Sequence, residues 1–139
     1  MAYDPNNIFA KIIRGEIPCH KVFEDARTIA FMDIMPQADG HTLVVPKENA
    51  ETIFDLSPDG AAALIQTAQR VARAVKKAIG APGIMLAQLN GPAAGQTVFH
   101  AHIHVIPRSG GADMRLHARQ AESPEILKTL AEKIRAAME

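Results

Sequence analysis

The chain of 139 residues is poor in several residue types that define other classes of protein. It has one cysteine, Cys19, so no disulfide can form within the chain, and a reducing compartment fits this usage. Tryptophan is absent and aromatic residues make up only 4%, which argues against the aromatic platforms on which nucleic-acid bases stack. No run of about 18 apolar residues exists to form a membrane-spanning helix. These absences exclude a disulfide-rich scaffold and argue against a membrane-spanning or base-stacking protein.

The chain also has no excess of positive or negative charge, because 15 lysines and arginines balance 15 aspartates and glutamates. Without a net charge or a basic run, we expect no electrostatic binding to nucleic acid or to anionic membranes. The first seven residues are polar and offer no signal-peptide core, so we expect a cytoplasmic protein. With 47% hydrophobic residues, a single chain of this length can bury its own core.

The periodicity of apolar residues predicts an α+β fold. Helices are expected over 7–14, over 57–79 and from Ser123 onward, with Asn7 and Ser57 as N-caps. Strands are expected over residues 20–24, 28–33, 41–45, 83–89 and 97–106. Only one long helix interrupts the strands, so a five-stranded antiparallel sheet is expected, with a short N-terminal helix and a C-terminal helix.

Three of the six histidines alternate with apolar residues inside the last expected strand. In a regular strand, His100, His102 and His104 share one face. The intervening side chains then point into the core on the other face: Phe99, Ala101, Ile103 and Val105. The simplest interpretation is a polar, solvated sheet face, but two chemical interpretations compete with it.

The first is a metal site. Neighbouring histidines of a strand lie about 7 Å apart at Cα, but the outer two lie roughly 13 Å apart. Because Zn–N bonds are only about 2.1 Å, a regular strand cannot bring all three to one ion. A metal would take two of them together with a distant ligand such as His41.

The second is nucleophilic catalysis by His102, because a neutral imidazole is a good nucleophile near pH 7. The preceding loop contains Gly91 and Gly95, which allow close backbone approach, and Gln96 and Thr97 offer side-chain donors. Such a loop forms a concavity for an anion. A nucleophile beside an anion cradle indicates phosphoryl or nucleotidyl transfer.

Residues 98–106, Val-Phe-His-Ala-His-Ile-His-Val-Ile, resemble the signature of the histidine triad (HIT) superfamily. The flanking Gly95-Gln96-Thr97 and Pro107-Arg108 are similar to the family's surroundings of that signature, and so are residues 8–18, 30–38 and 40–47. The resemblance covers roughly residues 7–108 and is nearest to the Hint branch. It implies a catalytic nucleotide-binding domain over 1–110 and a C-terminal extension over 111–139.

The resemblance implies a hydrolase or transferase that cleaves purine nucleoside phosphoramidates at the α-phosphate through a nucleotidyl-histidine intermediate. It implies no cofactor, and it implies a homodimer in which two five-stranded sheets are joined. Three alternatives remain open: a dinucleoside polyphosphate hydrolase, a nucleotide-binding interaction protein with incidental catalysis, and a metal-dependent enzyme that uses two of the histidines.

By the same resemblance, His102 is the nucleophile, His104 contacts the phosphate, and His100 orients the network together with His41. Asn90, Gly95 and Thr97 are expected to hold phosphate oxygens, and Gln96 or Thr97 to meet the leaving group. Asp33 is expected to bind the ribose hydroxyls. The nucleoside pocket is expected to be apolar, lined by Ile8, Phe9, Ile12, Ile17, Phe31, Ile34 and Leu43.

The chain departs from the pattern of some bacterial relatives at Asn7 and Ala10, where they carry a Cys-x-x-Cys pair of a structural zinc site. That zinc is therefore not expected here. His20 and His117 match no motif and are predicted to be ordinary surface residues.

Overall fold

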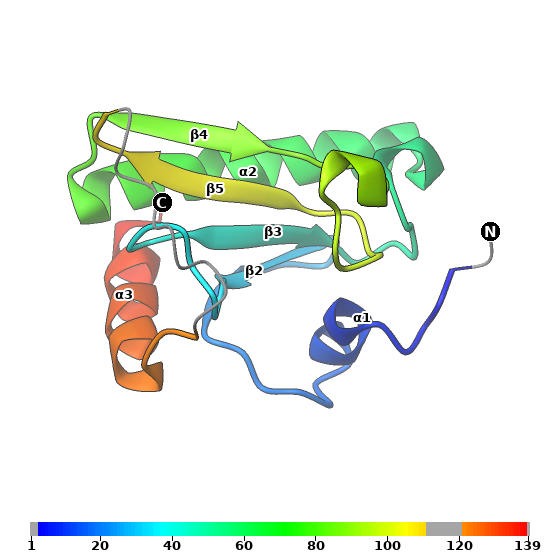
Figure 1. The fold of residues 1–139 in the computed structure, drawn as a ribbon, viewed down its shortest axis with the longest axis horizontal. Coiled ribbons are helices and arrows are strands. Elements are labelled where there is room, and N and C mark those ends of the chain that lie inside the picture. The colour runs from blue at the N-terminus through cyan, green and yellow to red at the C-terminus, as the bar shows by residue number, and fades with distance from the viewer. Residues whose placement is uncertain (1–2, 111–120, 139) are drawn as a thin grey trace.

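The computed structural model describes residues 3–110 and 121–138 and confirms the predicted α+β class. Five antiparallel strands form one sheet in the order β1-β2-β3-β5-β4 (Figure 1). The strands are β1 (Lys21–Glu24), β2 (Thr28–Met32), β3 (Thr42–Pro46), β4 (Gly83–Ala87) and β5 (Ile103–Arg108).

The helices are α1 (Ile8–Ile13), α2 (Pro58–Ile79) and α3 (Pro124–Ala137). Asn7 and Ser57 cap α1 and α2 as predicted, each accepting a hydrogen bond from the backbone N–H three residues on. Gly80 ends α2 in the left-handed region, with φ 74°. Ser123 precedes α3 but makes no side-chain cap hydrogen bond. None of the helices in the described ranges is both long and apolar enough to cross a membrane.

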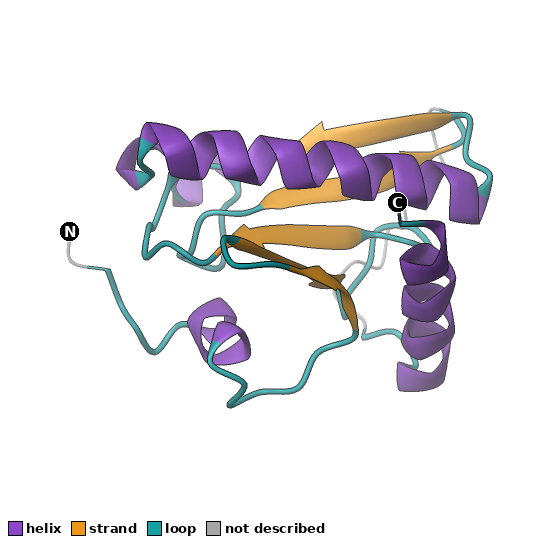
Figure 2. Cartoon of the chain, turned by 180° about the vertical axis from the view of Figure 1, so that it is seen from behind, coloured by secondary structure: helices purple, strands orange, loops and turns teal. Residues whose placement is uncertain are grey.

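One face of the sheet packs against α2 and α3 (Figure 2). Alternate residues of the inner strands point to this side, among them Ala30, Val44 and Val105. The helices contribute a buried stripe that includes Leu64, Val71, Val75, Leu127 and Ile134. The C-terminal helix therefore shares the core of the sheet. The start of the predicted extension, residues 111–120, lies outside the described residues.

The opposite face of the sheet carries a smaller core beneath α1. Phe9 of α1 packs against Phe31, with the ring centroids 5.4 Å apart and the planes 75° apart. Ile29, Leu43 and Val45 complete this cluster. Because Leu43 pairs with His104 across the β3–β5 ladder, His104 projects on the same face of the sheet.

The strand predicted over 97–106 is wrong at both ends. β5 begins at Ile103 and continues through Pro107 to Arg108, whereas the stretch before it is irregular. Pro107 is tolerated beyond Val105, the last residue that pairs with β3, where pairing continues with β4 alone. Phe99 is 37% exposed and does not point into the core as predicted, while Ala101, Ile103 and Val105 are buried.

Candidate active site

A cavity of about 710 Å³ opens on the α1 side of the sheet and takes in most of the residues expected to bind a nucleoside. A volume of this size is typical of small-ligand sites. The seven apolar residues expected around the nucleoside all line it: Ile8, Phe9, Ile12, Ile17, Phe31, Ile34 and Leu43. Asp33, His41, Gly95, Thr97, His102 and His104 line it as well. The cavity therefore joins an apolar region to a cluster of imidazoles and a carboxylate.

His102 presents a bare ring nitrogen in this cavity. Its Nδ1 lies 2.6 Å from the carbonyl oxygen of His100, which can only accept, so Nδ1 carries the proton and Nε2 keeps its lone pair. Only 5% of the residue is exposed, and burial lowers the pKa of His102 to about 4. The edge of the ring meets Phe9, with centroids 4.9 Å apart. At pH 7 His102 is therefore a neutral, oriented imidazole with a free Nε2.

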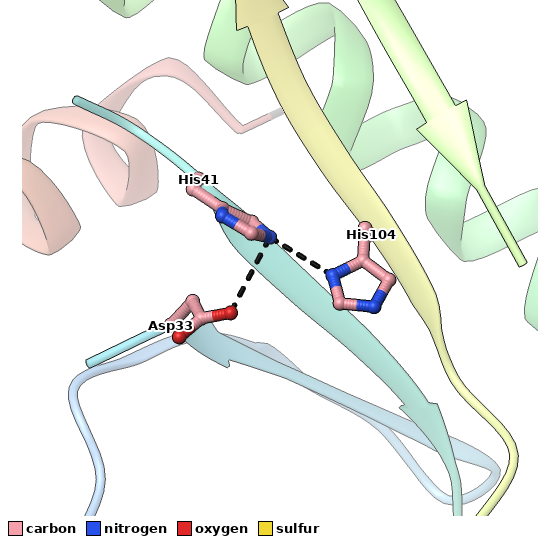
Figure 3. Close-up of side chains that lie close together, drawn as sticks. All are labelled: Asp33, His41 and His104. Atoms are coloured by element: carbon pink, nitrogen blue, oxygen red, sulfur yellow. Dashed lines mark hydrogen bonds and ion pairs between the residues drawn. The ribbon is translucent and has the colours of Figure 1, made fainter. Parts of the chain in front are cut away.

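His104 has the opposite arrangement, and a chain of hydrogen bonds explains why (Figure 3). The backbone N–H of Gln37 donates to His41 Nδ1 at 3.0 Å, so His41 must carry its proton on Nε2. That Nε2 lies 3.0 Å from His104 Nδ1 and donates to it. A neutral His104 then carries its own proton on Nε2. Burial lowers the pKa of both His41 and His104, which favours these neutral forms.

Asp33 stands at the end of β2 beside the two linked histidines. One carboxylate oxygen, Oδ2, lies 3.4 Å from His41 Nε2, and the other accepts the N–H of Met35 at 2.8 Å. Burial dominates the lowered pKa of His41, and the Asp33 carboxylate opposes that shift. The side chain is 19% exposed, so its oxygens are within reach of a ligand in the cavity.

Three side chains of this cluster are close enough to one another to suggest a metal site. One ligand atom from each of Asp33, His41 and His104 lies within 4.8 Å of the others. A zinc-bound histidine, however, bears its proton on the nitrogen that faces away from the metal and donates it to an outer acceptor. His41 Nδ1 instead accepts from the Gln37 N–H, which places the proton on the nitrogen facing the cluster. The cluster suits a hydrogen-bond relay and does not fit a metal ion.

His100 is not among the residues that line the cavity, and neither of its ring nitrogens bonds to His41. It is fully buried, and its Nε2 donates to the carbonyl oxygen of Pro46 at 2.7 Å. Its Nδ1 lies 2.6 Å from the hydroxyl of Tyr3. Burial lowers the pKa of His100 below its usual value. With His100 and His102 both buried, the interpretation of the three histidines as a solvated sheet face is wrong.

The loop before β5 differs from expectation at two polar residues. Gln96 is buried: its Oε1 accepts the N–H of Gly91, and its Nε2 donates to the carbonyls of Glu51 and Val98. The Asn90 amide is bonded to Gln88 and to the N–H of Ile53. Neither Gln96 nor Asn90 lines the cavity, because these bonds hold their amides against the loop backbone and against Glu51 and Ile53.

In the loop before β5, the polar groups at the cavity include the backbone of Gly95 and Thr97 and the Thr97 hydroxyl. Gly95 has φ 100° and Gly91 has φ 90°, conformations that glycine adopts without strain. Gly95 and the exposed Thr97 both line the cavity.

Some cavity residues carried no signal in the sequence. His20 lines the cavity and is not the ordinary surface residue predicted. Cys19 lies beside it, half-buried, and burial raises the pKa of its thiol. Gln37, Leu89 and Val98 also line the cavity. Gln37 acts on His41 through its backbone N–H, which any residue except proline possesses, so no side-chain pattern could have revealed it.

Comparison of the sequence with known proteins gives a consistent result. The model of the HIT domain matches residues 14–111. Protein hit of Bacillus subtilis is 39% identical over 134 residues, covering 93% of this chain and 92% of that protein. An adenosine 5'-monophosphoramidase of Schizosaccharomyces pombe is 39% identical over 130 residues, covering 91% and 94%. An adenylylsulfatase of Arabidopsis thaliana is 42% identical over 101 residues, covering 73% of this chain but only 51% of that protein.

The fold gives the same grouping. The crystal structure of a Hit-like protein from Bartonella henselae superposes with a TM-score of 0.92 at 50% identity, covering 99% of this chain and 100% of that one. A histidine triad nucleotide-binding protein from Sulfolobus tokodaii superposes with a TM-score of 0.85 at 33% identity, covering 93% and 89%. The arrangement of the histidines and the match over residues 14–111 lead to one conclusion: the chain belongs to the histidine triad (HIT) family.

Proposed function

We propose that the protein is a nucleotide hydrolase or transferase that cleaves purine nucleoside phosphoramidates at the α-phosphorus through a nucleotidyl intermediate on His102. The observation that carries the proposal is the tautomer of His102. Its Nδ1–H is held by the His100 carbonyl at 2.6 Å, so the bare Nε2 is available at a cavity large enough for a small ligand.

Two displacements account for the reaction. In the first, His102 Nε2 attacks phosphorus, an N–P bond forms, and the bond from phosphorus to the leaving amine breaks. In the second, water attacks the same phosphorus and the bond to Nε2 breaks, which releases the nucleoside monophosphate. Over both steps water supplies a hydroxyl to phosphorus and a proton to the amine. His102 ends in its starting form, and neither step changes an oxidation state, so water is the only co-reactant.

His104 is proposed to stabilise the charge on the phosphoryl group. Its Nδ1 is occupied by the proton of His41 Nε2, so its own Nε2–H is the donor available at the cavity. A donor fixed before the substrate arrives needs no reorganisation during the reaction. Gly95 and Thr97, at the rim of the same cavity, are proposed to hold further phosphate oxygens.

The nucleoside is proposed to occupy the apolar part of the cavity. Asp33 offers carboxylate oxygens to the ribose hydroxyls, and the Phe9–Phe31 pair offers aromatic surface to the base. Two relatives bear names that fit an adenylate-type substrate, the adenosine 5'-monophosphoramidase and the adenylylsulfatase. Both names support cleavage next to an adenylyl group. The leaving group is an amine for the phosphoramidase and sulfate for the adenylylsulfatase.

The proposal is tested by incubating the purified protein, in the presence of a chelator, with adenosine phosphoramidate. We expect release of AMP and, after acid-free quenching, an intact-mass increase of one adenylyl group. A dinucleoside polyphosphate added to the same assay competes directly and reveals which leaving group is preferred. Tight AMP binding without any turnover would contradict the proposed activity.

A further inference from the structure

Tyr3, near the N-terminus, contacts His100, which lies 97 residues away in the sequence. Its hydroxyl lies 2.6 Å from His100 Nδ1, and the two rings meet edge-on with centroids 5.5 Å apart. His100 Nε2 is already committed as a donor to the carbonyl of Pro46, so Nδ1 is bare and the Tyr3 hydroxyl is the donor. Both ring nitrogens of His100 are thus hydrogen-bonded, one to β3 and the other to Tyr3 in the N-terminal arm, which is the segment of residues 3–7 that precedes α1.

His100 in turn holds the proposed nucleophile. Its carbonyl oxygen accepts the Nδ1–H of His102 at 2.6 Å, and the next residue, Ala101, donates its N–H to the carbonyl of Ala50 at 2.8 Å. This stretch lies outside β5, so no strand ladder fixes the direction of the His100 carbonyl. The contacts to Pro46, Ala50 and Tyr3 fix it instead.

We infer that Tyr3 is a positioning residue for the reaction at His102. Its hydroxyl holds the His100 ring in the tautomer and orientation that aim the His100 carbonyl at His102 Nδ1, which directs Nε2 toward the substrate. Tyr3 does not line the cavity, so it acts through His100 and touches no substrate. The kinetic consequence rests on the proposed function, because it requires His102 to be the nucleophile.

The sharpest variant is Tyr3→Phe, which keeps the ring and removes only the hydroxyl. We expect kcat for adenosine phosphoramidate to fall roughly two- to tenfold, the size that corresponds to one lost hydrogen bond to a buried acceptor. KM should stay within about twofold, because the residues that line the cavity are unchanged. Asp4→Ala is the matched control: it removes the carboxylate that accepts the Asn6 N–H, in the residue next to Tyr3, and it keeps the Tyr3 hydroxyl. This control should retain wild-type kcat.

Nitrogen-15 NMR of the histidine rings tests the contact without relying on turnover. In the wild type, His100 should show a protonated Nε2 and a hydrogen-bonded, unprotonated Nδ1; Tyr3→Phe should shift the Nδ1 resonance of His100 and also the Nδ1–H of His102. If Tyr3→Phe leaves both resonances or kcat unchanged, the inference is wrong, and an equal loss of kcat in Asp4→Ala with its His100 resonances unchanged would also overturn it. Should the wild type hydrolyse no phosphoramidate, the proposed function fails, while the NMR comparison still decides whether Tyr3 sets the His102 ring.

Discussion

Three backbone groups set the protonation of the histidines in this site, directly at His41, His100 and His102 and through His41 at His104. The carbonyl of Pro46 accepts from His100, the carbonyl of His100 accepts from His102, and the N–H of Gln37 donates to His41. A carbonyl forces the ring nitrogen that it meets to carry the proton, and an N–H forces it to be bare. Three histidines of similar environment therefore acquire different roles: an anchor at His100, a proposed nucleophile at His102 and a proposed donor at His104.

Replacement of His102 by alanine tests the proposed nucleophile. Turnover of adenosine phosphoramidate should fall by at least about 10³-fold, because no other bare imidazole nitrogen of the network is aimed at the phosphorus. Affinity for AMP, measured by calorimetry, should change by less than about threefold, since most of the nucleotide is held elsewhere in the cavity. A variant that retains full activity, or that still forms a nucleotidyl adduct by intact mass, would show that another residue attacks.

The low pKa of His102 predicts the acid limb of the rate profile. Neutral His102 is the active form, so kcat/KM should fall as the pH drops through about 4 and should be level between about pH 5.5 and 8. An imidazole in water would give a midpoint near pH 6.5 instead. The groups facing the ring are the His100 carbonyl, His104 and Asp33; burial and His104 lower the pKa, and the other two oppose them. Initial rates corrected for uncatalysed hydrolysis, with circular dichroism at each pH, measure this limb; a midpoint above pH 6 would contradict it.

The sequence and its resemblance to the histidine triad family predicted the three histidines and the apolar lining of the cavity, but not the tautomers. Alternating histidines are visible in the sequence, and so are the apolar residues of α1 and β2. Tyr3 and Gln37 were missed, because one lies 97 residues from its partner and the other acts through a backbone group. A sequence shows which side chains are present, whereas a tautomer depends on which backbone group lies opposite.

At the scale of elements, the most informative difference is the late start of β5. Alternation over residues 97–106 indicated a strand, but residues 97–102 lie outside β5, and His100, Ala101 and His102 are all buried while Phe99 is partly exposed. Ala101 donates its backbone N–H to Ala50, in the segment that follows β3, and the His100 ring donates to Pro46, the last residue of β3. A period of two in the sequence cannot distinguish a paired strand from an irregular segment that is held by other hydrogen bonds. The caps of α1 and α2 were predicted correctly, because capping depends on a few neighbouring residues.

Gln96 holds the loop between β4 and β5 in place, and Gln96→Ala should destabilise it. The substitution leaves the N–H of Gly91 and the carbonyl of Glu51 without their partner, which should lower the free energy of unfolding by about 1–3 kcal/mol. The adjacent Thr97→Ala is the control for stability: this side chain is exposed, so a change below about 0.5 kcal/mol is expected. Urea denaturation followed by circular dichroism measures both, and equal stability of the two variants would contradict the structural role of Gln96.

At the scale of the whole molecule, the two edges of the sheet are unlike. β1 is short, carries Lys21 and Glu24, has an irregular register with β2 and contacts α3. These are features that protect an edge from pairing. β4 forms the other edge, and its residue Leu86 is 43% exposed. Beside it runs a groove between β4 and α2 whose apolar lining includes Ile65, Ala72, Ile84 and Leu86.

We propose that this edge pairs with the same edge of a second copy and so forms a homodimer. A twofold axis beside β4 would place β4 against its partner's β4 and extend the two five-stranded sheets into one, while the groove side chains of each copy cover the other. Leu86→Lys places a charge in the middle of this surface and should weaken self-association at least about tenfold. Ile126→Lys, an equally exposed apolar residue of α3 at 45%, is the matched control and should leave association unchanged. Sedimentation equilibrium distinguishes the outcomes: a wild type that is monomeric at micromolar concentration, or a Leu86→Lys variant that associates as tightly as Ile126→Lys, would place the interface elsewhere or exclude it.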